Sequence, residues 1–125
     1  MTISVVRLGS PRGKAEGPRL GTVRRPPRGV KKSDYARLGY YDLWLPELSP
    51  SAKLVKLAQS GDWKKFERLY RNEMARPEPQ RLLELLALLS HGSDFAVGCY
   101  CQDESRCHRS ILRALLSDNG ARISQ

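Results

Sequence analysis

Long apolar runs are absent from this sequence of 125 residues. A helix that crosses a bilayer needs at least about 18 mostly apolar residues in a row, and no stretch approaches that length. The opening segment, MTISVVRLGSPRGK, also lacks the apolar core of a secretory signal. The sequence therefore predicts a cytoplasmic protein with no membrane partner.

Cysteine is scarce as well, since the chain contains only three. In the cytosol we therefore expect free thiols, metal ligands or nucleophiles rather than structural disulfides. All three cysteines lie in GCYCQDESRCHRSILRALL, residues 98–116, together with one of the two histidines and three arginines. This clustering makes residues 98–116 the first candidate for a functional site.

Acidic residues are rare in the first third of the chain. Residues 1–37 hold ten basic side chains but only Glu16 and Asp34, so ten minus two gives +8 of the formal net charge of +9. Five glycines and four prolines between residues 9 and 32 prevent a long helix there. We predict a basic loop over about residues 9–37, which contains at best a short strand at 20–24.

Apolar patterning predicts the fold class. Helical spacing indicates four helices, over residues 51–59, 62–75, 80–92 and 107–120. Residues 2–8 and 94–101 are rich in β-branched or apolar residues and are predicted strands. Because the second strand is apolar on both faces, we expect one α/β domain over residues 1–125. Its central sheet would be at least partly parallel and covered by helices on both faces. The helix at 80–92, apolar on most of its circumference, is expected to be buried on more than one side.

The order of these elements suggests a binding site at the cysteines. Cys101 ends the second predicted strand, and the last helix begins near Cys107. In open α/β sheets, ligands bind where a strand ends and a helix begins, because free N–H groups there favour an anion and lower the pKa of a thiol. Arg106, Arg109 and Arg113 are spaced to line one face of that helix. The alternative is a capped helix whose arginines only face solvent.

A metal site is a further alternative. Cys99, Cys101, Cys107 and His108 would suit zinc chemically, but structural zinc sites present two ligand pairs in tight loops. Alternation places Cys99 in an apolar row, where it is expected to be a small buried core residue. Our main prediction therefore includes no metal and no cofactor. A structural zinc site and a Cys101–Cys107 redox pair stay open.

Three motifs in order resemble those of the domain-of-unknown-function 488 (DUF488) family: YYDLWLPELSPS at 40–51, W..F...Y..EM at 63–74, and CYCQDESRCHRSIL at 99–112. The stretch PPRGVKK keeps part of another family motif, with Pro26 where tryptophan is usual. The resemblance implies a compact α/β domain with a polar cleft near Cys107, His108 and Arg109. It implies no particular reaction.

Together these observations predict a cleft between the basic loop and the last helix that binds a phosphate- or carboxylate-bearing small molecule, for example a nucleotide. The residues assigned to the ligand are Arg7, Arg28, Lys32, His108 and Arg109. For an enzyme, the catalytic candidates are Cys101, Cys107 and Asp42. The alternative is a nucleic-acid-binding module that uses residues 7–37, with Tyr35, Tyr40 and Tyr41 as stacking surfaces. We make no prediction about oligomeric state.

Overall fold

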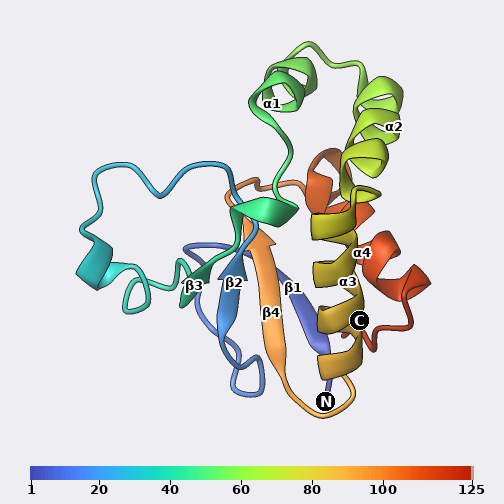
Figure 1. Ribbon diagram of the computed structural model, residues 1–125. Helices are drawn as coiled ribbons and strands as arrows, with labels where there is room; N and C mark the ends of the chain where they lie inside the picture. Colours follow the sequence, from blue (N-terminus) through green and yellow to red (C-terminus); the bar gives the residue numbers. More distant parts are fainter. Residues whose placement is uncertain (125) are drawn as a thin grey trace.

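Four parallel strands form the centre of the fold (Figure 1). The computed structural model describes residues 1–124. The strands are β1 (Ile3–Arg7), β2 (Arg19–Gly21), β3 (Leu43–Trp44) and β4 (Phe95–Cys99). Their order is β1-β4-β2-β3, and every neighbouring pair is parallel. All four carboxyl ends therefore lie at one edge of the sheet, and the predicted α/β class with parallel pairing is confirmed.

Strand β4 is central and wholly buried, as its continuous apolar run predicts. It pairs with β1 from Ile3 to Arg7 and with β2 along its other side. A side chain at Gly98 would begin 2.7 Å from the carbonyl oxygen of Val6. Glycine at this position therefore allows β1 and β4 to approach closely.

Four helices follow β3 and β4: α1 (Ala52–Gln59), α2 (Trp63–Met74), α3 (Pro77–Leu89) and α4 (His108–Asp118). The side chains of Ser51 and Asp62 cap α1 and α2, each accepting a hydrogen bond from a backbone N–H of the first turn. Helix α3 begins at Pro77 rather than at the predicted Gln80, because a proline in the first turn removes no intrahelical hydrogen bond. No described helix has the length and apolarity to cross a bilayer.

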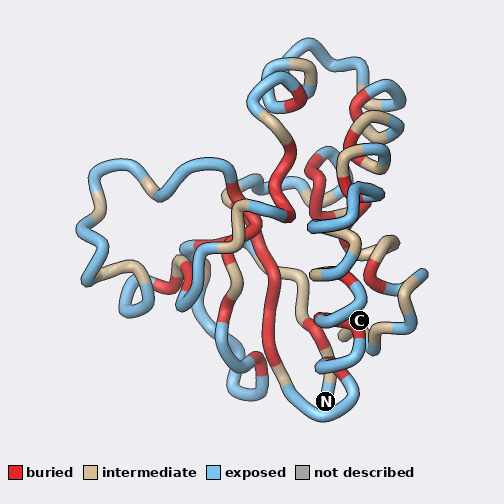
Figure 2. Tube along the Cα trace, in the orientation of Figure 1, coloured by how far each residue is buried: buried red, intermediate tan, exposed pale blue. Residues whose placement is uncertain are grey.

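The main core lies between the helices and one face of the sheet (Figure 2). Strand residues such as Phe95 and Val97 pack there against apolar side chains of all four helices. Helix α3 contributes through Leu83 and Leu86, but Leu88 on its outer side is 72% exposed. The prediction that this helix is buried on more than one side is therefore wrong.

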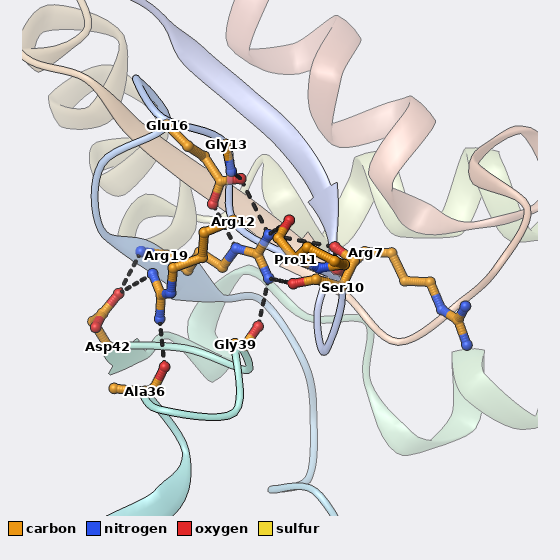
Figure 3. A network of polar contacts seen from close by, with 10 residues as sticks. All are labelled: Arg7, Ser10, Pro11, Arg12, Gly13, Glu16, Arg19, Ala36, Gly39 and Asp42. Atoms are coloured by element: carbon orange, nitrogen blue, oxygen red, sulfur yellow. Dashed lines mark hydrogen bonds and ion pairs between the residues drawn. The ribbon is translucent and has the colours of Figure 1, made fainter.

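Loops cover the opposite face of the sheet. Residues 8–18 and 22–42 connect β1 to β2 and β2 to β3, with one short 3₁₀ turn, η1 (Lys32–Asp34), as their only helical segment in the described chain. Arg19 points into this layer and binds Glu16 and the carbonyl groups of Ser10, Pro11 and Gly39 (Figure 3). A strand face that carries a charged side chain needs polar partners, which loops provide. Within residues 1–124, the expected helices therefore cover one face of the sheet, and loops cover the other.

Candidate functional site

The candidate site lies at the carboxyl edge of the sheet, where β4 ends at Cys99. The chain continues through a 3₁₀ turn, η3 (Glu104–Arg106), and enters α4 at His108. Asp103 fixes the turn by accepting hydrogen bonds from the backbone and hydroxyl of Ser105. Cys107 then occupies the N-cap position in extended conformation, which directs its side chain back toward the end of β4.

This path brings all three cysteines together. The Sγ atoms of Cys99 and Cys107 are 2.6 Å apart, and the three sulfurs all lie within 4.8 Å of one another. Cys99 and Cys107 are buried, whereas Cys101 is exposed. Cys99 is therefore buried as predicted, but it is also a member of the thiol cluster, which the strand pattern alone did not indicate.

The cluster favours a thiolate at Cys101. Hydrogen bonds from the thiols of Cys107 and Cys99 lower the pKa of Cys101, and the positive charge of Arg109 acts in the same direction. The same contacts raise the pKa of Cys99 and of Cys107, since both act as donors. Cys101, the exposed member, is thus the first sulfur to lose its proton.

His108 is buried beside the cluster. Its Nε2 lies 2.7 Å from the carbonyl oxygen of Thr22, and because a carbonyl only accepts, Nε2 carries the hydrogen. Burial lowers the pKa of His108 to about 4, so the ring is neutral at pH 7. The Nδ1 lone pair is then an acceptor that lies 3.7 Å from the Sγ of Cys107.

Arg109 places a fixed positive charge under the cluster. It is only 3% exposed, and its Nη2 donates to the carbonyl oxygen of Cys101 at 2.6 Å. Its Nε is buried without a hydrogen-bond partner among the described residues. Burial acts to lower the pKa of Arg109, but the neighbouring sulfurs of Cys99 and Cys107 raise it on balance.

A cavity of about 600 Å³ opens onto the three cysteines and His108. Its wall includes apolar side chains such as Val55 and Phe66. A second cavity of about 680 Å³ shares Arg25, Arg28 and Tyr100 with the first. The basic residues that line the two are Arg7, Arg24, Arg25, Arg28, Lys56 and Arg106. No acidic residue of the described chain lines either cavity.

Backbone contacts hold the basic segment at this edge. The Tyr100 hydroxyl donates to the carbonyl oxygen of Arg25 at 2.8 Å, and the Trp44 indole donates to that of Val23 at 2.7 Å. Arg24 donates from Nε to the carbonyl oxygen of Pro50. The carbonyl oxygens of Val23 and Arg25 are thus held by two neutral donors, the Trp44 indole and the Tyr100 hydroxyl.

The predicted site residues divide into two groups. Cys101, Cys107, His108 and Arg28 line the first cavity, and Arg7 lines the second.

Lys32, Asp42 and Arg109 line neither cavity. Asp42 instead accepts hydrogen bonds from Arg12 and from the backbone N–H of Arg19. Its contacts are therefore in the loop layer and not with the cysteines. The predicted arginine face of the last helix is also divided, because Arg113 pairs with Glu104.

Sequence reasoning missed Arg24, Arg25 and Lys56. The RRPPR run at 24–28 was a usable signal for the two arginines, since it lies in the predicted basic loop. Nothing in the sequence singled out Lys56, which reaches the cavity only because α1 folds over the edge of the sheet.

The tyrosines proposed as a stacking surface for nucleic acid pack against other side chains. Tyr41 is 5% exposed, and its ring meets that of Tyr35 edge to face at 5.2 Å. Tyr40 makes a similar contact with Tyr100 at 6.2 Å. Tyr41 is therefore not available to stack on a base in this conformation.

Comparison with known proteins identifies the family. Neither a curated protein nor a solved structure matches the chain. One family model does, over residues 3–120, and it is described as the active DUF488-N3 subclade. Because this match covers nearly the whole chain, the protein belongs to the DUF488 family.

Proposed function

We propose that the protein binds a phosphate- or carboxylate-bearing small molecule in the two adjoining cavities at the carboxyl edge of the sheet. The observation that carries this proposal is the charge of the lining, which includes six basic side chains and no acidic one. None of the six forms an ion pair within the described residues. An arginine fork pairs with carboxylate or phosphate through two parallel hydrogen bonds, which suits it to this role.

The cavities also contain a surface for the uncharged part of such a ligand. Their volumes fall in the range of about 300–1,000 Å³ that small-molecule sites occupy. Tyr40, Tyr100 and two prolines line the second cavity next to Arg25 and Arg28. This pairing of charge with flat apolar groups supports a nucleotide as a member of the ligand class.

We further propose that the protein is an enzyme whose reaction takes place at the cysteine cluster that lines the first cavity. Cys101 is exposed and lines the same cavity as four arginines. The word "active" in the description of the matched subclade supports catalysis. Asp42 has no part in this proposal, because it is engaged with Arg12 and Arg19.

Calorimetry with phosphate, a nucleoside monophosphate and acetate tests ligand binding. We expect an Arg25→Ala/Arg28→Ala variant to bind at least about tenfold more weakly, since each lost charged hydrogen bond is worth about 1.5–3 kcal/mol. The matched control is Lys31→Ala/Lys32→Ala, which removes two charges from the same loop outside both cavities. Equal weakening in the two variants would refute the site.

The same pair of variants tests the nucleic-acid alternative. Binding by the whole basic segment would depend on its total charge and fall steeply with salt. Both double variants would then lose affinity for an oligonucleotide to the same extent. For the small-molecule site, we expect only the arginine variant to lose binding and a nucleotide to protect Cys101 from alkylation.

A further inference from the structure

We propose that Cys99, Cys101 and Cys107 bind one Zn²⁺ ion as thiolates and leave its fourth position open to the anion-binding cavity. The three sulfurs lie within 4.8 Å of one another, although they come from a strand end, a loop and a helix N-cap. A zinc ion at about 2.3 Å from each sulfur would separate the sulfurs by about 3.8 Å. The sulfurs of Cys99 and Cys107, which are 2.6 Å apart, would have to move apart to reach that arrangement.

Arg109 is the second observation that points to a metal. Three thiolates around Zn²⁺ carry a net charge of −1, which is costly to bury without a cation. Arg109 lies against Cys99 and Cys107, and its buried Nε has no hydrogen-bond partner among the described residues. The charge of this buried guanidinium beside the sulfurs would offset the negative charge of the zinc site.

The donor set selects the class of metal. Thiolates prefer Zn²⁺ and other soft or borderline ions over Mg²⁺ or Ca²⁺. The grouping within 4.8 Å does not include His108, whose Nε2 donates to Thr22 and whose Nδ1 lies 3.7 Å from the Sγ of Cys107. The fourth position is thus left for water or for a ligand from the cavity, as in catalytic rather than structural zinc sites.

The open position connects the metal with the proposed function. All three cysteines line the cavity that also contains the arginines, so an anionic oxygen held there would reach the ion. Zinc would polarise that oxygen as a Lewis acid. This last step rests on the proposed anion binding, whereas binding of the metal itself does not.

Metal titration of the reduced, metal-free protein tests the proposal. We expect one Zn²⁺ per chain in competition with a chelator, and one Co²⁺ whose spectrum shows thiolate-to-metal charge transfer. Up to three thiol protons are released to solvent on binding, one from each cysteine still protonated. The single variants Cys99→Ser, Cys101→Ser and Cys107→Ser are each expected to weaken binding at least tenfold. Circular dichroism of each variant confirms that it is folded.

The Arg25→Ala/Arg28→Ala variant separates this proposal from the proposed function. It is expected to bind Zn²⁺ unchanged and to lose only the anion. The metal site would be refuted by the absence of stoichiometric binding, by a cobalt spectrum without charge transfer, or by unchanged affinity in Cys101→Ser. A Cys99–Cys107 disulfide that persists in protein purified under reducing conditions would refute it as well.

Discussion

Replacing Arg19 with methionine removes the charge that holds the loop layer onto the sheet. Its side chain is fully buried, and it donates to both carboxylate oxygens of Glu16 (Figure 3). It also donates to the carbonyl oxygens of Ser10, Pro11 and Gly39. Methionine fills a similar length of the site but donates to none of these five acceptors.

The expected loss of stability is about 3–5 kcal/mol, the cost of breaking a buried ion pair from one side. Most of it arises because Glu16, only 8% exposed, keeps a negative charge without its partner. A Glu16→Gln/Arg19→Met variant lacks that charge, so it is expected to be less destabilised than the sum of the two single changes. Arg12→Met is the matched control. Its ion pair with Asp42 is about a third exposed on both sides, and such pairs contribute about 0–1 kcal/mol.

Urea unfolding followed by circular dichroism measures these differences. We expect a lower midpoint for Arg19→Met with an unchanged dependence on denaturant, since the folded core is retained. A loss below about 1 kcal/mol, or equal losses for Arg19→Met and Arg12→Met, would refute the idea that this network stabilises the loop layer.

Three further perturbations test other parts of the fold. Burial alone would raise the pKa of Glu16, but hydrogen bonds from its arginine partner and from a backbone N–H lower it below 4.5 on balance. Its contribution is therefore present above about pH 4.5 and lost as the pH falls through the folded pKa, so Glu16→Gln should flatten the acid side of a stability–pH profile. Tyr70→Phe leaves the buried carbonyl of Leu48 without its donor and should cost about 1–3 kcal/mol in urea unfolding, whereas no change would mean that the hydrogen bond is unimportant. Gly17→Ala forces a Cβ to within 2.0 Å of the Asp94 carbonyl oxygen at a positive φ, and thermal unfolding should show a loss of at least about 1–3 kcal/mol.

The sequence predicted the helices and the central strand well, because helix caps and apolar patterns mark the elements that are buried in the structure. Ser51 and Asp62 mark two helix starts through side chains that act within a single turn. The apolar run of β4 predicted a central strand, since only burial on both faces accounts for it. The loop layer could not be predicted in this way, because the partners of Arg19 are separated from it by up to 20 residues and show no periodicity.

The sequence predicted those parts of the candidate site whose reactive residues lie at the end of a strand or at the start of a helix. Cys101 and Cys107 could be placed at one edge because a strand end and a helix start flank them. The contact between Cys99 and Cys107 depends on the extended backbone at Cys107, which no local signal indicates. Asp42 was predicted to be catalytic, but its carboxylate holds the loop layer by accepting hydrogen bonds from Arg12 and Arg19. The sequence next to Asp42 does not distinguish these two roles.

The loop layer and the candidate site are coupled through the basic segment at 23–28. Its backbone is fixed by Tyr100 and Trp44 at the carboxyl edge, so Arg25 and Arg28 remain available to a ligand. The same loop returns to the Arg19 network at Gly39. Loss of that network should therefore increase the mobility of the loop and weaken anion binding, although Arg19 touches neither cavity. Cys99 and Cys107 also pack in one cluster with Leu8, Val23 and Tyr41 of the loop layer, so loss of the network should weaken zinc binding as well.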